Sequence, residues 1–327
     1  LSPVVTNMWT IAANNYPSIP TLDDTSYALR GLAYDPNLGR LLVADHFNIY
    51  ALDATNQTYI ERLNTAGLPD VGLNSWVIDQ IRVADDGAVY ACNLQDDFYR
   101  PNTLCIIRWS DSTSSASLAS SWGSTTGADP SGSSERMGDT MAVRGGGNDT
   151  QILMGTAASQ KVVLFTTANG TDFTPVVIVV TNAPAGFASA GVAFGAGANT
   201  FWAKGDAGYN LREVTFDIND PTNAFVSKVY TAGAQVPNAM GGFGVDTARN
   251  VLLGVNFDNT PDDLELFLLS GNSNPPALVH QAFFPSANPN ISLFTAVDIK
   301  YPWAFGLDVN NGIVALNYGT PAAPAVT

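Results

Sequence analysis

The sequence has few basic residues and no long apolar run. Lysine and arginine together number 14, against 29 aspartate and glutamate residues, so the formal net charge is −15. Nucleic acids and anionic membrane surfaces attract cationic patches, and a chain with this charge balance offers little to either. No stretch approaches the roughly 18 consecutive apolar residues of a membrane-spanning helix. We therefore expect no nucleic-acid partner and no membrane insertion.

Histidine and cysteine are also scarce, with two of each. The sequence contains no His-Glu-x-x-His motif, no Cys-x-x-Cys motif and no phosphate-binding P-loop. It also lacks the Gly-x-Ser-x-Gly turn that carries the nucleophile of many serine hydrolases. These absences argue against zinc, nucleotide or haem as a cofactor. Carboxylate and amide side chains remain as the main candidates for chemistry.

The composition favours an extracellular, secreted protein. Only four residues are lysine, and Ser, Thr and Asn are abundant. The chain begins Leu1-Ser2-Pro3, which fits a mature chain whose signal peptide has been removed. Cys92 and Cys105 flank a polar segment between two strand-like runs, and a hairpin would bring them within reach of a disulfide. We predict a Cys92–Cys105 disulfide, with two free buried thiols as the alternative.

An internal repeat accounts for almost the whole chain. Each copy combines short β-rich runs with turns of Gly, Asn and Asp, and no run has helical periodicity over three turns. Equivalent positions recur at spacings of roughly 50 to 60 residues, which suit a four-stranded propeller blade. These positions are Gly31, Gln80, Thr140, Gly191, Gly242 and Ala296.

The two ends of the repeat pattern complement each other. The sixth copy stops short of a fourth strand, while residues 4–11 form a strand with no partner before them. Pairing the two would complete the last sheet and protect its edge. The sequence therefore predicts an all-β fold: a single domain over residues 1–327, built as a closed six-bladed β-propeller of four-stranded antiparallel blades. The N-terminal strand completes the last blade, and the oligomeric state is left open.

The turn segments carry a resemblance to known propellers. Segments 30–36, 83–87, 138–140 and 245–250 resemble those of a family of secreted bacterial propellers classed as a domain of unknown function. This resemblance spans nearly the full length and implies the fold without an activity. In architecture the chain is also similar to six-bladed calcium-dependent lactonase and phosphotriesterase propellers. That similarity implies a calcium-bound hydrolase, but the glutamate typical of the lactonases has no match at the candidate positions described next.

Polar side chains recur at two aligned positions of the repeat. The residues just before the equivalent positions include Arg30, Asp79 and Asp139, and the residues that end the second strands include Asp45, Asn93, Asn256 and Asp308. Both positions open on one face of a propeller, around the mouth of its central channel. These seven residues form our candidate ligand-binding set.

Two kinds of ligand suit this set. Asp79 and Asp139 are candidate ligands for calcium, which prefers carboxylate and amide oxygens. Carbohydrates or carboxylated ligands would use the same groups, with Arg30 as a bidentate anchor. The alternative is that Arg30 and the aspartates only neutralise one another at the strand ends, where Asn and Asp are favoured in any case.

Two further features lie near this face. Phe98 and Tyr99, together with His46 and Phe47, fall in its loops and could stack against a ligand. The acidic run at residues 258–265 could hold calcium, but a solvated loop is the simpler interpretation.

Three functions are compatible with this sequence. Low charge and the lack of an activated nucleophile favour an extracellular binding or structural module that recognises a carbohydrate or a protein at the channel mouth. The first alternative is a calcium-dependent hydrolase, lactonase or lyase that uses the channel-mouth carboxylates. The second alternative is a subunit of an extracellular filament or surface assembly. The sequence leaves open whether the protein is an enzyme.

Overall fold

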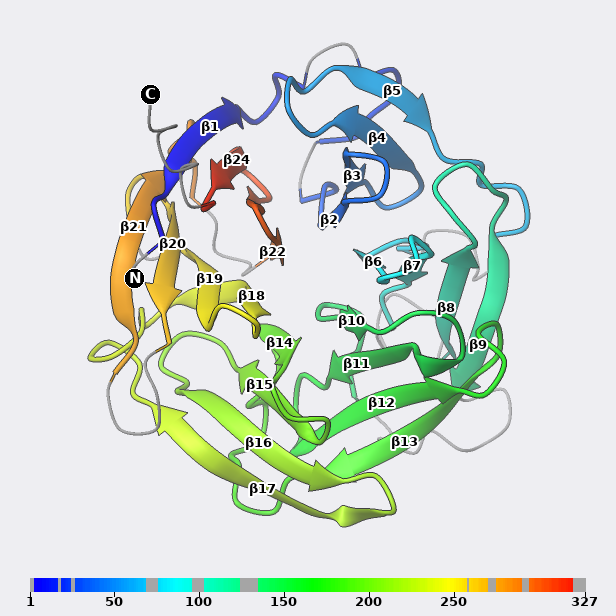
Figure 1. Ribbon diagram of the computed structural model, residues 1–327, viewed down its shortest axis with the longest axis vertical. Coiled ribbons are helices and arrows are strands. Elements are labelled where there is room, and N and C mark those ends of the chain that lie inside the picture. The colour runs from blue at the N-terminus through cyan, green and yellow to red at the C-terminus, as the bar shows by residue number, and fades with distance from the viewer. Residues whose placement is uncertain are drawn as a thin grey trace, which may run out of the picture.

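The computed structural model describes residues 3–16, 19–24, 27–68, 76–95, 103–123, 135–257, 259–269, 275–289 and 294–319. Within these ranges the strands form six four-stranded antiparallel sheets, which Figure 1 shows as a ring around a central channel. The predicted six-bladed β-propeller is therefore confirmed. No helix in the described part of the chain is long and apolar enough to span a membrane.

Each blade runs outward from the channel in chain order, and we number the blades 1 to 6 from β2. The innermost strands are β2 (Gly31–Asp35), β6 (Gln80–Val83), β10 (Ala142–Arg144), β14 (Gly191–Phe194), β18 (Met240–Asp246) and β22 (Thr295–Lys300). The second strands are β3 (Arg40–Ala44), β7 (Val89–Cys92), β11 (Gln151–Gly155), β15 (Thr200–Lys204), β19 (Val251–Asn256) and β23 (Trp303–Asp308).

The third strands are β4 (Ile49–Asp53), β8 (Thr103–Trp109), β12 (Lys161–Thr167), β16 (Leu211–Asp217), β20 (Asp263–Leu268) and β24 (Gly312–Asn317). The outer strands are β5 (Tyr59–Arg62), β9 (Ser117–Gly123), β13 (Phe173–Val179), β17 (Asp220–Tyr230), β21 (Ala277–Phe283) and, in blade 6, β1 (Thr6–Ile11). A single 3-10 turn, η2 (Gly147–Asp149), joins β10 to β11 in the described residues.

The ring closes through the first strand of the chain. β1 pairs antiparallel with β24, from Thr6 opposite Asn317 to Ile11 opposite Ile313. Trp9 of β1 also donates a hydrogen bond from its indole nitrogen to the Ala54 carbonyl of blade 1, at 2.9 Å. The blue strand beside the red one in Figure 1 is this closure. The predicted completion of blade 6 by the N-terminal strand is confirmed.

The hydrophobic core is divided among the interfaces between blades. Each of six buried clusters draws side chains from two neighbouring blades, as when Leu42 of blade 1 and Ile81 of blade 2 share one cluster. Middle strands such as β7 are buried on both faces, so apolar residues occupy successive positions rather than alternate ones. The blades therefore hold one another in place, and the channel between them has rigid walls.

Glycine at the equivalent positions allows the innermost strands to approach one another. A Cβ added to Gly242 would lie 2.6 Å from the carbonyl oxygen of Thr295 in the next blade. A Cβ added to Gly191 would lie 2.6 Å from the ring of Phe243. A Cβ at either position would force neighbouring atoms to shift, so glycine here allows the close approach of neighbouring innermost strands.

The predicted disulfide between Cys92 and Cys105 is wrong. Both residues are free, buried thiols. Cys92 pairs with Ile106 across β7 and β8, so Cys105 lies one residue out of register and its side chain points to the opposite face of the sheet. Cys92 packs in the cluster between blades 2 and 3, whereas Cys105 packs in the cluster between blades 1 and 2. The sheet of blade 2 separates the two sulfur atoms.

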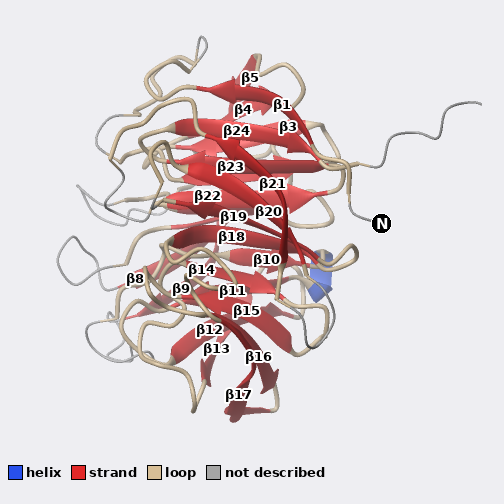
Figure 2. Cartoon of the chain, turned by 90° about the vertical axis from the view of Figure 1, so that its left-hand side faces the viewer, coloured by secondary structure: helices blue, strands red, loops and turns tan. Residues whose placement is uncertain are grey.

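The central channel has two distinct ends. We call the end at which the innermost strands begin the entry mouth, and the end at which they finish the exit mouth. Figure 2 shows η2 at the right-hand edge of the molecule, and because η2 follows β10, that edge is the exit mouth. The sequence-predicted residues Arg30 and Asp79 immediately precede β2 and β6, so they belong to the entry mouth.

Candidate functional site

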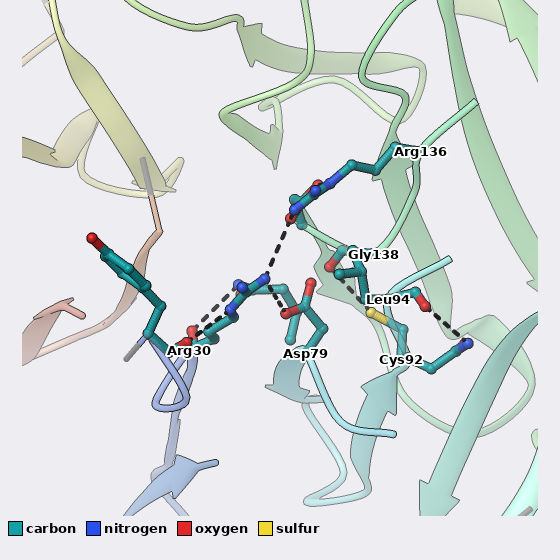
Figure 3. A network of polar contacts seen from close by, with 10 residues as sticks. Arg30, Asp79, Cys92, Leu94, Arg136 and Gly138 are labelled. Carbon is teal, nitrogen blue, oxygen red and sulfur yellow. Dashed lines mark hydrogen bonds and ion pairs between the residues drawn. The ribbon is translucent and has the colours of Figure 1, made fainter. Parts of the chain in front are cut away.

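The structure brings three of the candidate residues together at the entry mouth. Nη1 of Arg30 lies 3.1 Å from Oδ1 of Asp79 and 3.8 Å from Oδ1 of Asp139. The three residues come from the starts of blades 1, 2 and 3, and Figure 3 shows Arg30 beside Asp79. Equivalent positions in neighbouring blades meet because each innermost strand begins at the same level of the ring.

A fourth charged residue, Arg136, completes this group. Its Nε and Nη2 donate hydrogen bonds to the two carboxylate oxygens of Asp139, at 2.5 and 2.7 Å. The result is a row in which charges alternate in the order Asp79, Arg30, Asp139, Arg136, and we call these four residues the charge row. Two guanidinium groups balance two carboxylates, so the repulsion between the aspartates is offset within the row.

Aromatic rings hold Arg30 in place. Its Cζ lies 3.7 Å from the centroid of the Trp76 ring and 3.5 Å from that of Phe294. Nε donates to the carbonyl oxygen of Tyr27, at 3.0 Å, and only 6% of the side chain is exposed. A guanidinium group flanked by two rings gains cation–π attraction and loses rotational freedom. Arg30 is therefore a fixed charge.

Asp79 is the member of the row whose carboxylate is least well satisfied. It is buried, and its Oδ2 has no hydrogen-bond partner among the described residues. Burial raises the pKa of Asp79 to about 7; the nearby Arg30 opposes this shift, and the Asp139 carboxylate adds to it. A carboxyl group in this position can hold a proton near neutral pH.

The carboxylate oxygens of the row are mostly occupied. Both oxygens of Asp139 accept hydrogen bonds from Arg136, and Oδ1 of Asp79 accepts one from Arg30. Calcium takes six to eight oxygen ligands in its sites. A calcium ion at Asp79 and Asp139 would have to displace two guanidinium groups, so calcium at this pair stays a prediction. No group of three or more His, Cys, Asp or Glu side chains in the described ranges is arranged to hold a metal ion.

Asp45 and Asn93, which follow the second strands of blades 1 and 2, bond mainly to their own loops. Oδ1 of Asp45 accepts hydrogen bonds from the backbone N–H groups of Phe47 and Asn48, at 2.8 and 2.7 Å. The side chain of Asn93 accepts from the Cys105 N–H at 2.7 Å and donates to the Thr103 carbonyl at 3.0 Å. A ligand would compete with these bonds.

Asn256 of blade 5 and Asp308 of blade 6 each lie beside other polar residues of their blades. Asn256 is opposite Asp263 in the register of β19 and β20, and Asp308 accepts a hydrogen bond from Asn311 at 3.2 Å. Contact with Asp308, added to burial, raises the pKa of Asp262 to about 8. The seven candidates therefore do not form one ring of ligands.

The acidic run at residues 258–265 differs from the solvated loop that we expected. Asp262, Asp263 and Glu265 are buried. The reason is that β20 begins at Asp263, so the second half of the run is part of the sheet. Burial raises the pKa of Glu265 to about 7. The apolar residues that alternate with these acids, Leu264 and Leu266, were the pattern that indicated a strand.

An aromatic surface adjoins the charge row. The His46 ring lies 4.1 Å from the Phe47 ring and 5.0 Å from the Trp76 ring, measured between centroids. Phe47 is 47% exposed. The side chains of Phe98 and Tyr99, which we expected on the same face, lie outside the described residues.

Sequence reasoning missed Arg136, Trp76 and Phe294. Two of them share a position, because Trp76 and Arg136 each lie three residues before an aligned residue, Asp79 or Asp139. Tyr27 lies three residues before Arg30 in the same way. Extending the alignment by three residues toward the N-terminus of each copy would have found most of the site.

Known structures share this architecture. No family model matches the sequence, and no curated protein matches it either. A DUF4623 family protein from Bacteroides eggerthii superposes with a TM-score of 0.65 at 14% identity, over 97% of this chain and 75% of its own. A luciferin-regenerating enzyme gives a TM-score of 0.51 at 11% identity, over 98% of this chain and 100% of its own.

A candidate 6-phosphogluconolactonase from Bacteroides uniformis gives a TM-score of 0.51 at 10% identity, over 84% of this chain and 76% of its own. Identities this low establish the propeller fold alone, because one fold carries many activities. The resemblance to a propeller family of unknown function and to lactonase-like propellers is confirmed at that level.

Proposed function

We propose that this protein is an extracellular binding module that recognises a carbohydrate at the entry mouth. The observation that carries the proposal is the charge row. Arg30 is buried and held between two aromatic rings, whereas the end formed by Asp139 and Arg136 is partly exposed to solvent. There Arg136 is 31% exposed and Asp139 is 17% exposed. Sugar hydroxyl groups donate to a carboxylate and accept from a guanidinium group, so the exposed pair can bond to adjacent hydroxyls.

The aromatic surface supports the same proposal. A sugar ring has an apolar face, and an exposed aromatic ring offers a flat apolar surface for it. Phe47, backed by His46 and Trp76, provides such a surface next to Arg30. Low lysine content and a Ser, Thr and Asn-rich composition support the extracellular location. The two free cysteines give that location no support.

Titration of the protein with soluble polysaccharides and oligosaccharides, followed by calorimetry, tests the proposal. Phe47→Ala should weaken binding of a retained saccharide by roughly tenfold, which corresponds to the loss of one stacking contact. Phe225→Ala is the matched control, because Phe225 is 46% exposed on the outer strand β17. An unchanged saccharide affinity in Phe47→Ala, or a complete lack of saccharide binding, would contradict the proposal. Binding of proteins alone would favour a protein ligand at the same mouth.

The second candidate function is a hydrolase of lactones or related esters. One observation favours it: burial raises the pKa of Asp79 to about 7, which suits a general base near neutral pH. Hydrolysis of a lactone panel, measured with and without added calcium, tests this function. Turnover that is lost in Asp79→Asn would support it, and calcium dependence would support a metal at Asp79 and Asp139. Assembly into a filament stays a prediction.

A further inference from the structure

A second cavity lies at the opposite end of the channel from the proposed carbohydrate site. It has a volume of about 370 Å³ and is bounded by the ends of the innermost strands of blades 2 to 6. Small-molecule sites usually start near this size, and most of their lining is apolar. Here Phe194, Phe243, Val297 and Ile299 supply apolar walls. The cavity sits at the exit mouth, on the side of η2 in Figure 2.

The two mouths do not share a ligand. Between them the channel narrows to a space of about 10 Å³ beside Thr140, Gly191 and Phe243, which is enough for about one water molecule. Arg82 lines both this constriction and the exit cavity. A molecule that enters at the exit mouth therefore meets Arg82 at the narrow end of the cavity.

Cations gather at the exit cavity. Of the 14 basic residues in the chain, four line it: Arg82, Arg144, Arg249 and Lys300. Three carboxylates, Asp85, Asp246 and Asp298, line it as well. Acidic residues outnumber basic ones by about two to one in the whole chain, so this balance is reversed locally.

Arg82 and Lys300 have only neutral hydrogen-bond partners. Nη1 of Arg82 donates to the carbonyl oxygens of Ile81 and Leu32, at 2.7 and 3.1 Å, and lies 3.5 Å from Oε1 of Gln80. Nζ of Lys300 reaches across to the Val83 carbonyl, at 2.6 Å. Nε and Nη2 of Arg82 have no partner among the described residues, so they are available to a ligand.

Arg144 is a third cation without a carboxylate partner. It donates to Gln151 at 2.8 Å, to the Gly197 carbonyl at 3.3 Å and to the Ala198 carbonyl, and its Cζ lies 4.2 Å from the Phe194 ring. Burial lowers the pKa of Arg82 and of Arg144 from the usual arginine value, so enclosure disfavours both charges. An anion in the cavity would compensate them.

The carboxylates of the cavity already have partners. Asp246 accepts from Arg249 at 3.1 Å and from the Tyr318 hydroxyl at 2.8 Å. Asp298 accepts from the Tyr34 N–H at 2.6 Å, and Asp85 accepts from the Gly145 N–H at 3.2 Å. Within the described residues, no carboxylate lies within ion-pair distance of Arg82, Arg144 or Lys300, and Asp298 offsets the charge of Arg82 only in part, against the effect of burial.

We propose that the exit mouth binds a small organic anion, with its carboxylate or phosphate group on Arg82 and Lys300 and its apolar body against Phe194 and Phe243. Charge-assisted hydrogen bonds from a guanidinium and an ammonium group are the strong kind. The rigid walls pre-organise these donors, which lowers the entropy lost on binding. The site lies at the other end of the channel from the carbohydrate site, and neither proposal depends on the other.

Two probes of similar size and different charge test the proposal. Benzoate carries an anion and an aromatic ring, whereas benzyl alcohol carries the ring alone. Calorimetric titration should show benzoate binding at least roughly tenfold more tightly, because only benzoate gains the charge-assisted bonds. Its affinity should fall as salt is added, since ions screen a partly exposed charge. Equal binding of the two probes, or no binding of benzoate, would overturn the proposal.

Matched variants locate the site. Lys300→Met keeps an unbranched side chain and removes the charge, so it should weaken benzoate binding by about fivefold or more. Lys228→Gln removes a charge from the outer strand β17 and should leave benzoate binding within about twofold. Melting temperatures of both variants show whether they are folded. Equal losses in the two variants would place the anion elsewhere and refute the exit-mouth site.

Discussion

The two mouths of the channel are built on the same six strands and use their charges in opposite ways. At the entry mouth, two arginines and two aspartates pair with one another in the charge row, and aromatic rings enclose Arg30. At the exit mouth, Arg82 and Lys300 bond only to carbonyl and amide oxygens beside an open cavity. In the first arrangement opposite charges pair with one another, and in the second positive charge remains for a ligand.

This contrast separates charges that stabilise the fold from charges that remain for an anionic ligand. A buried ion pair adds little over apolar packing, but removal of one partner leaves a charge that the protein interior cannot solvate. Arg30 is in that situation, because it compensates two aspartates at once. Lys300 compensates no carboxylate within reach in the described residues. Substitutions at the two mouths should therefore have different consequences.

The largest effect is expected for Arg30→Ala. It removes the charge between Asp79 and Asp139 and empties the space between Trp76 and Phe294. The free energy of unfolding, measured with urea, should fall by about 3–5 kcal/mol, as for other broken buried pairs. Arg62→Ala, at an exposed position on β5, should change it by less than about 0.5 kcal/mol. A small change at Arg30 would show that the charge row is not structural.

A second effect is expected from pH, and it should arise away from the exit mouth. Burial raises the pKa of Asp79 and Glu265 to about 7 and that of Asp262 to about 8, from ordinary values of 3.8 to 4.5. The folded protein then holds protons that the unfolded chain releases. Their stabilising effect is complete below about pH 4 and is lost as the pH rises through 7 to 8.

Urea unfolding between pH 5 and 8 measures this loss. The free energy of unfolding should decrease as the pH rises, by less than roughly 1.4 kcal/mol per pH unit for each proton involved, because solvent screens the groups that are partly exposed. Asp262→Asn should flatten the upper part of the profile, because it removes the group with the highest of these pKa values. Lys300→Met should leave the profile unchanged. Stability that rises over this range would contradict the assignment.

The fold and part of the entry mouth were predictable because a propeller is a repeat. Equivalent positions in the sequence become neighbours around one ring, so Arg30, Asp79 and Asp139 meet as expected. The completion of blade 6 followed from the same counting of strands. Arg136 was missed because the comparison of the repeats began at Asp139, and Phe294 because it precedes the aligned residue of its blade.

Strand register and side-chain size explain why the disulfide prediction was wrong and why the exit cavity was not predicted. The disulfide was wrong because a shift of one residue in pairing turns a side chain to the other face, and a long loop does not determine that shift. The exit cavity depends on small residues at one aligned position in three neighbouring blades, Ala142, Ala193 and Gly244. Its cations, Arg82 and Lys300, occupy different positions of their repeats, so alignment does not reveal that they converge.

A third prediction contrasts the mouths directly. Lys300→Met should change the free energy of unfolding by less than about 0.5 kcal/mol, because the ammonium group gives up a single hydrogen bond to a carbonyl oxygen. The same urea experiment that tests Arg30→Ala measures it. A loss of several kcal/mol at Lys300 would mean that both mouths are structural, and the division between stability and binding would fail.

The smallest effect concerns the two thiols. Burial raises the pKa of Cys92 and of Cys105, so little reactive thiolate exists in the folded state. Without reductant, intact-mass analysis should show no alkylation of the native protein and two alkylated thiols after unfolding. Sγ of Cys92 lies 3.5 Å from the Gly138 carbonyl, beneath the entry mouth. Arg30→Ala should therefore speed the reaction of Cys92 in the folded protein, whereas Lys300→Met should not. If neither thiol reacts in the unfolded chain, the cysteines are joined, and the register of blade 2 described above is incorrect.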